Sequence, residues 1–124
     1  MGETPHRIRQ EDQGGRAIFY LEGEFDIYSS PDLKERLLEA IDGGCNEIII
    51  DLTKVVYVDS TFLGVVVRAV KKTRGRRGKV GLVISDENIR RVFDITGLDR
   101  ILLTYETNQE AQNGFDRGDK PIHT

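Results

Sequence analysis

Few residues in this sequence could do chemistry, and their spacing argues against catalysis. The two histidines, His6 and His123, lie near the chain ends, where no structure is expected to hold an imidazole for proton transfer. The one cysteine, Cys45, follows two glycines and has no neighbour in sequence that would activate a thiol. No acids and histidines have the spacing of a metal site. The sequence therefore predicts a non-enzymatic protein without a metal or other cofactor.

One segment, YVDSTFLG at residues 57–64, does contain a candidate chemical group. Asp59 and Ser60 stand directly before an apolar run that can start a helix, and either side chain is a good N-cap. A phosphate can also be placed at such a position, because free amides and the helix dipole accept its charge of about −1.5 to −2. On the residues alone, Ser60 is either a cap or a site where charge is added and removed.

The helix that follows Ser60 is expected to leave an apolar surface beside the hydroxyl. One helical stripe contains Leu63, Val66, Val67 and Val70. If that stripe faces a sheet, then Phe62, Val65 and Ala69 fall on flanking or outward faces. Exposed apolar surface of this kind commonly marks contact with a partner. We therefore expect a protein to dock next to Ser60.

A second candidate acceptor is Asp51, at the end of an apolar strand. The phosphoacceptor carboxylate of a response-regulator receiver would lie at such a place. A receiver also has an acidic pair after its first strand to bind magnesium. Here the early acids stand at a turn, as Glu11 and Asp12, and on either side of a glycine, as Glu22 and Glu24. The receiver interpretation is the less supported alternative.

Basic residues cluster after the Ser60 helix. They are Lys71, Lys72, Arg74, Arg76, Arg77 and Lys79. Such a cluster could bind phosphates or an acidic partner, but cations at a helix C-terminus also stabilise the helix dipole by about 0.3 to 1 kcal/mol each. The dipole explanation is favoured. The glycines of GRRGKVG match neither the dinucleotide nor the P-loop pattern and predict a turn.

Length and charge limit the classes of function. A chain of 124 residues with a net charge of −3 fits one domain and argues against a dedicated nucleic-acid binder. The single cysteine excludes an internal disulfide, which fits a reducing compartment. No apolar run is long enough to span a bilayer. We expect a cytoplasmic protein that contacts neither nucleic acid nor membrane.

The elements that must position Ser60 alternate between strands and helices. The predicted strands are a hairpin of residues 7–11 and 16–22 around a turn at 12–15, then 47–52, 79–84 and 101–103. The predicted helices run from Ser30 to the glycines at 43–44, from Ser60 to about Thr73, from Asp86 to Thr96, and from Thr107 to about Asn113. This order predicts an α/β fold with a single mixed sheet, an N-terminal hairpin, otherwise largely parallel strands and about four helices.

Local signals set several boundaries. Ser30 before Pro31 predicts an N-cap with proline at the first helical position. Thr107 and Glu110 have the spacing of a capping box. Residues 116–124 are expected to form a disordered tail. In sheets of this kind the functional crevice lies beyond the carboxyl ends of the strands, where the predicted loop 53–59 delivers Ser60.

Three segments give the chain a family resemblance. They are GEFD at residues 23–26 with Ser30 and Pro31 after it, the strand end at 51–52 with VDSTFLG at 58–64, and FDITGL at 93–98. In these segments the chain resembles the STAS-domain anti-sigma factor antagonists of bacteria, over roughly residues 7–111. The resemblance implies a STAS domain at 1–115. Phe62 departs from the family pattern, which usually has glycine after the hydroxyl pair.

The resemblance also implies a mechanism of partner switching, in a stress response or in sporulation. The unphosphorylated protein would bind an anti-sigma factor that is also a serine kinase, and so release a sigma factor. Phosphorylation of Ser60, with Thr61 as a second candidate, would loosen that complex, and a serine phosphatase would restore it. The residues expected at the partner interface are Asp26, Asp59, Ser60, Thr61, Phe62 and Val65. The alternative function is a constitutive scaffold or interaction subunit of a larger signalling assembly, with Ser60 only capping a helix.

Overall fold

The apolar strands assemble into one sheet of five strands in the computed structural model, which describes residues 6–123. The strands are β1 (Arg7–Asp12), β2 (Arg16–Phe25), β3 (Glu47–Val58), β4 (Lys79–Val83) and β5 (Leu103–Tyr105), and they lie in this order across the sheet. β1 is antiparallel to β2, and the other neighbours are parallel. The predicted mixed sheet with an N-terminal hairpin is confirmed.

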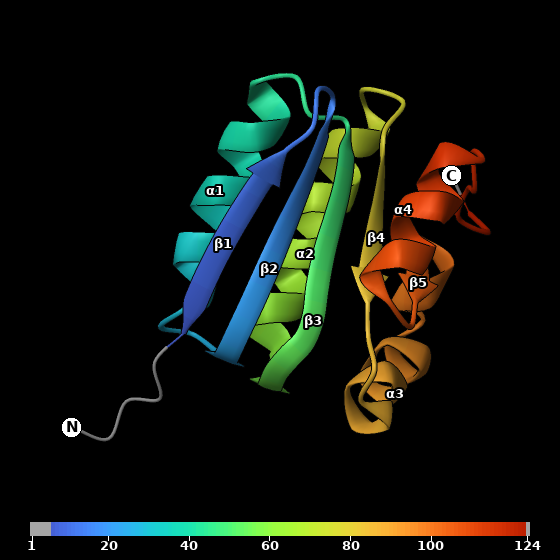
Figure 1. Ribbon diagram of the computed structural model, residues 1–124. Coiled ribbons are helices and arrows are strands. Elements are labelled where there is room, and N and C mark those ends of the chain that lie inside the picture. The colour runs from blue at the N-terminus through green and yellow to red at the C-terminus, as the bar shows by residue number, and fades with distance from the viewer. Residues whose placement is uncertain (1–5, 124) are drawn as a thin grey trace.

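Four α-helices cover the two faces of this sheet. They are α1 (Ser30–Asp42), α2 (Ser60–Arg74), α3 (Glu87–Thr96) and α4 (Asn108–Asp116), with a short 3-10 turn at Leu98–Arg100. Figure 1 shows α1 and α2 behind β1, β2 and β3, whereas α4 lies on the other side of the sheet beside β4 and β5. No helix among residues 6–123 has both the length and the apolar character needed to cross a bilayer.

The sheet separates a large apolar core from a small one. Ile48 and Ile50 belong to the large core on the α1 and α2 side, and Ile49 belongs to the small core under α4. All three side chains are fully buried. Because consecutive residues of a strand point to opposite faces, a strand covered on both sides needs an unbroken apolar run. The prediction of a central strand buried on both faces is confirmed.

The buried face of α2 differs from the predicted stripe. The residues that it buries are Phe62, Val65, Val66, Ala69, Val70 and Thr73. Leu63 and Val67 are only half-buried. The outward face is marked instead by Gly64, Arg68 and Lys71, which follow one another at helical spacing and are all exposed. Two overlapping apolar stripes fit the sequence, and the polar residues opposite decide between them.

Several boundaries also need correction. β3 continues to Val58, where a loop from residue 53 was expected, because its second half stays paired with β2. The last strand lies two residues later than predicted, at Leu103–Tyr105. Ser30 is already the first residue of α1, and its buried hydroxyl has no hydrogen-bond partner within residues 6–123, so the predicted cap at Ser30 is wrong.

The expected disordered tail packs against the domain over residues 117–123. Asp119 is held at two points, because its backbone oxygen accepts from Lys79 Nζ at 2.6 Å and its Oδ2 from the Tyr105 hydroxyl at 3.0 Å. Further along, the His123 amide donates to the backbone oxygen of Arg100 at 2.8 Å. The C-terminal segment is therefore an ordered part of the domain surface. The polar composition of residues 117–123 did not indicate this attachment.

Candidate functional site

Ser60 is the first residue of α2, and its side chain is exposed. The cap of this helix is Asp59, whose Oδ1 accepts from the amides of Thr61 at 2.9 Å and of Phe62 at 3.3 Å. Within residues 6–123 the Ser60 hydroxyl takes part in none of the side-chain hydrogen bonds. Of the two alternatives for Ser60, a helix cap or a site of modification, the first is not observed, because Asp59 caps the helix and Ser60 faces solvent.

The sheet brings a second acid to the same edge. β2 and β3 are parallel, and Phe25 pairs with Val58 at their carboxyl ends. Asp26 and Asp59 come directly after these two residues, so they leave neighbouring strands that are about 4.8 Å apart. The expectation that Asp26 lies at the Ser60 end of the molecule agrees with this register.

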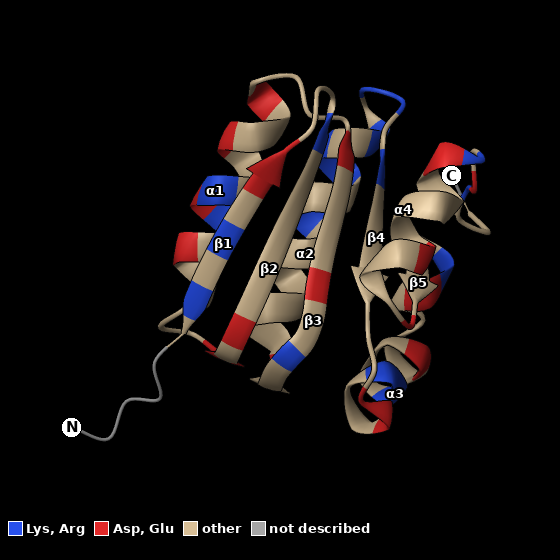
Figure 2. Ribbon diagram, viewed as in Figure 1, with Lys and Arg blue, Asp and Glu red and all other residues tan. Residues whose placement is uncertain are grey.

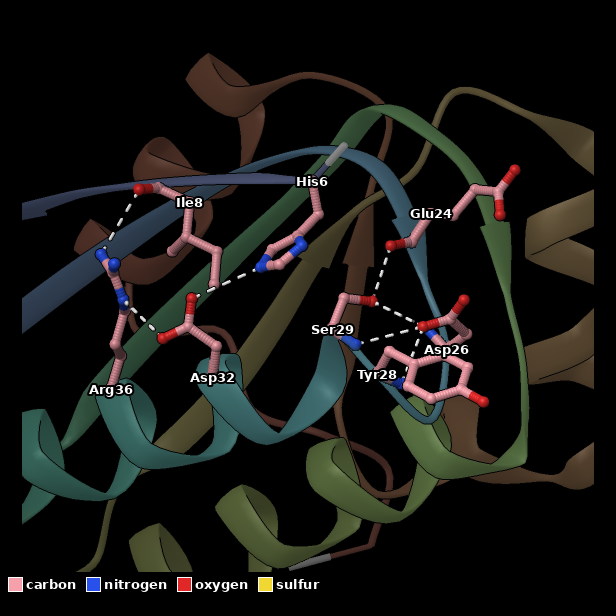
Figure 3. A network of polar contacts seen from close by, with 8 residues as sticks. All are labelled: His6, Ile8, Glu24, Asp26, Tyr28, Ser29, Asp32 and Arg36. Carbon is pink, nitrogen blue, oxygen red and sulfur yellow. Dashed lines mark hydrogen bonds and ion pairs between the residues drawn. The ribbon is translucent and has the colours of Figure 1, made fainter. Parts of the chain in front are cut away.

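Asp26 organises the loop between β2 and α1 (Figure 3). Its Oδ1 accepts from the amides of Tyr28 at 2.9 Å and of Ser29 at 3.1 Å. The Ser29 hydroxyl lies 2.7 Å from the backbone oxygen of Glu24 and accepts from the Asp26 amide at 2.9 Å. These bonds, above all the one from the Tyr28 amide, hold the pKa of Asp26 below its usual value. Asp26 is therefore a loop-forming residue as well as a candidate contact.

The exposed apolar side chains at this edge are not those expected from the sequence. Tyr28 is 85% exposed and Ile27 is 62% exposed, both in the loop that Asp26 holds. Val56 and Tyr57, at 70% and 47%, are exposed near the end of the neighbouring strand β3. For Ile27 and Tyr28, the signal in the sequence was a pair of large apolar residues between Asp26 and Ser29, outside any periodic element. We call these four residues, Ile27, Tyr28, Val56 and Tyr57, the apolar rim.

The expected outward placement of Phe62 and Val65 is wrong. Phe62 is fully buried and Val65 is 6% exposed, and both belong to the large core. The Phe62 ring packs edge-to-face on Phe25, with 6.0 Å between ring centres. Because Phe25 precedes Asp26, this contact braces the end of β2 against the start of α2. Thr61 is half-buried.

The alternative acceptor, Asp51, lies on the other face of the sheet and has both oxygens engaged. Its Oδ1 accepts from the Thr53 hydroxyl at 2.7 Å and from the Thr53 amide at 2.9 Å. Its Oδ2 accepts from Asn108 Nδ2 at 3.2 Å. The residue is only 7% exposed. These contacts give Asp51 a structural role in joining β3 to α4, and they do not favour a receiver.

Cys45 also has a structural environment. It is half-buried and packs against the large core. Burial raises the pKa of its thiol, which disfavours the reactive thiolate.

Comparison with known proteins agrees with the fold. The model of the STAS domain family matches residues 7–111. The anti-sigma-B factor antagonist of Listeria monocytogenes is 40% identical over 96 residues, which are 77% of this chain and 82% of that protein.

Two solved structures share the fold. An anti-sigma factor antagonist from Mycobacterium paratuberculosis superimposes with a TM-score of 0.81 at 24% identity, over 89% of this chain and 93% of that one. The Bacillus cell fate determinant SpoIIAA in its phosphorylated form gives a TM-score of 0.72 at 21% identity, over 88% of this chain and 99% of that one.

Proposed function

The chain belongs to the STAS domain family, among relatives that are anti-sigma factor antagonists, and from this premise we propose that it is a binding switch controlled at Ser60. These relatives are regulatory proteins, so the chain is a regulator and not an enzyme. In the proposed cycle the unphosphorylated protein binds an anti-sigma factor that is also a serine kinase, and a sigma factor is released. Phosphorylation of Ser60 ends the binding, and a serine phosphatase restores it in the cytoplasm.

The observation that supports this proposal is that Asp59 caps α2 while the Ser60 hydroxyl is exposed and makes no structural bond within residues 6–123. Because Asp59 already caps α2, a phosphate on Ser60 removes no bond that holds the helix. The amides and dipole at the helix start also tolerate the added charge of about −1.5 to −2. The fold can therefore stay intact while the surface at Ser60 gains strong negative charge.

The apolar rim supplies the surface on which the partner docks. Large exposed apolar side chains are common at the centres of protein interfaces, and tyrosine is enriched there. Tyr28 is the most exposed of the four, and it is held in place through the backbone by Asp26. A hydrated phosphate on Ser60 at this edge would have to lose its water for the apolar contact to form. Repulsion of the partner then follows from desolvation.

The test uses an anti-sigma factor kinase from the organism that encodes this protein. Wild type, Ser60→Ala and Thr61→Ala are incubated with the kinase and ATP, and phosphopeptides are read by mass spectrometry. We expect phosphate on wild type and on Thr61→Ala but none on Ser60→Ala. Phosphorylated wild type should then bind the kinase at least about tenfold more weakly than Ser60→Ala treated in the same way.

Two outcomes would contradict the proposal. Phosphate on Thr61 alone would move the acceptor to the half-buried neighbour. Equal binding of phosphorylated and unphosphorylated protein would favour the constitutive scaffold, in which Ser60 has no regulatory role.

A further inference from the structure

A cavity of about 600 Å³ lies at the opposite end of α2 from Ser60. It is bounded by the end of α2, the turn into β4, the starts of β3 and β4, and the C-terminal segment. A helix rises 1.5 Å per residue, so Ser60 and Arg74 are separated by about 20 Å. A cavity of this volume is in the usual range for small-molecule sites. It is distinct from the edge where the partner is proposed to bind.

The basic cluster divides into two groups around this cavity. Figure 2 shows basic residues filling the turn between α2 and β4. Lys72 and Arg76 turn toward α1 and pair with Asp42, at 2.9 Å and 3.3 Å. Arg74 and Arg77 line the cavity instead, and neither takes part in an ion pair in the part of the chain that the structure describes. Two of the six basic residues therefore share one carboxylate, whereas Arg74 and Arg77 face the cavity without one.

The C-terminal segment and β4 add further positive charge. Lys120 lines the cavity and forms no ion pair among residues 6–123. Lys79 Nζ donates to the backbone oxygen of Asp119 at 2.6 Å and lies 4.6 Å from the centre of the Phe115 ring, so its closest partners are uncharged. Burial lowers the pKa of Lys79, which an anion beside it would reverse.

The acid in the lining does not cancel this charge. Glu47 lines the cavity, and its Oε1 is bound by Arg16, with Nη2 at 3.0 Å. The carboxylate of Asp119 is in turn paired with Arg117 at 3.0 Å. The cavity therefore has an excess of positive charge. The lining also has an apolar part, formed by Val70, Val80, Ile101 and Pro121, and two uncharged or weakly basic polar side chains, those of Thr73 and His123.

The backbone at Arg77 supports a role for its side chain. Arg77 has a φ of 59°, in the left-handed region that favours glycine. The next residue, Gly78, approaches the backbone of Asn46 so closely that any side chain would collide with its carbonyl group. The turn is thus fixed, and it presents a guanidinium at a position where glycine would be less strained.

We propose that this cavity binds a small organic phosphate, with the phosphate held by Arg74, Arg77 and Lys120 and the organic group against Val70 and Val80. Unpaired cations from two separate segments suit a dianion better than a single carboxylate, because each opposite charge must be matched. The apolar wall suits a carbon skeleton more than a bare phosphate ion. The wall is formed in advance by the bonds of Asp119 and His123 to the domain.

The test is a titration of the full chain with three probes, followed by amide chemical shifts in NMR. The probes are 1-naphthyl phosphate, inorganic phosphate and 1-naphthol. We expect saturable shifts with 1-naphthyl phosphate in residues 74–80 and 117–123, and binding at least about tenfold weaker for each of the other two probes. Shifts centred on residues 57–64 would overturn the proposal, as would no saturation by about 10 mM.

Variants separate the cavity from general charge. Arg77→Gly removes the guanidinium and relaxes the backbone, so it should fold at least as well as wild type, yet bind 1-naphthyl phosphate about ten- to a hundredfold more weakly. Arg76→Gln changes the adjacent residue, which faces Asp42, and should alter the affinity by less than about threefold. Equal losses in both variants would show binding to diffuse charge and would refute the site. Ser60→Ala should leave the affinity unchanged, so this result is independent of the proposed switch.

Discussion

The two ends of α2 use charge in opposite ways. At the start, the carboxylates of Asp26 and Asp59 bind backbone amides, and the surface that remains consists of a hydroxyl and the apolar rim. At the end, Arg74 and Arg77 have no carboxylate partner within residues 6–123 and stand beside a hollow. Both sets of charges suit the helix dipole, which favours acids at the start and bases at the end. The dipole therefore does not distinguish the two ends. They differ in whether the charged side chains already have a bonding partner in the protein.

This difference indicates what each end can bind. A side chain that is occupied with its own backbone fixes the shape of a surface, and a fixed surface with exposed tyrosines suits a protein. A side chain without a partner can exchange water for a ligand, and a concave setting suits a small one. The predictions below either disrupt one end or compare the two.

The largest effect is expected from the residue that braces the first end. Phe62→Ala should lower the free energy of unfolding by about 3 to 5 kcal/mol, because it removes a fully buried ring that packs on Phe25. Tyr28→Ala at the exposed surface should change it by less than about 0.5 kcal/mol. Urea denaturation measures both. A small loss for Phe62→Ala would mean that the ring does not brace the site.

The next effect compares the cap with its neighbour. Asp59→Ala should cost about 1 kcal/mol of stability, since two amides at the start of α2 lose their acceptor. Ser60→Ala should cost less than about 0.5 kcal/mol, since the exposed hydroxyl holds no structure. Thermal unfolding of the two variants under the same conditions tests this. The reverse order would make Ser60 the cap and would weaken the case for a switch.

A similar effect is expected at the second end. Tyr105→Phe removes the hydroxyl that donates to Asp119 and should cost about 1 kcal/mol. It should also speed amide hydrogen exchange in residues 117–123, because the C-terminal wall loses one of its attachments. Tyr57→Phe, an exposed tyrosine at the first end, is the matched control and should change neither quantity. If exchange in the wall is unaltered, the wall does not depend on Asp119.

The smallest effect is a dependence on pH at the first end. Hydrogen bonds from the loop amides lower the folded-state pKa of Asp26, so the ionised form favours folding. This contribution is present above the unfolded pKa of about 4 and is lost as the pH falls through the lower folded-state value. Denaturation of wild type and Asp26→Asn between neutral and acidic pH should show the two curves converging in acid. Parallel curves would mean that Asp26 contributes no such stability.

The sequence predicts the presence of the strands and helices well because their signals are local. The unbroken run of isoleucines at 48–50 identifies a strand buried on both faces, and Thr107 caps its helix as predicted, accepting from the Glu110 amide at 3.1 Å. The family resemblance adds the position of Ser60.

Features that depend on tertiary contacts are harder to predict. Two different apolar stripes of α2 could face the core, and only the exposed series of Gly64, Arg68 and Lys71 shows which one does. The attachment of residues 117–123 depends on Lys79 and Tyr105, which are remote in the chain. The cavity follows from that attachment and has no local signal. The apolar rim was missed because Ile27 and Tyr28 lie in a loop, and Val56 and Tyr57 lie in the part of β3 that was predicted to be a loop.

The separation of Asp59 from Ser60 has an evolutionary consequence. A residue that anchors nothing can be replaced without loss of folding. If the switch operates as proposed, a lineage that substitutes alanine at position 60 would acquire a regulator that its kinase cannot silence. A substitution of Asp59 would instead damage the protein itself. Constitutive descendants of this fold should therefore differ at the hydroxyl while keeping the acid before it.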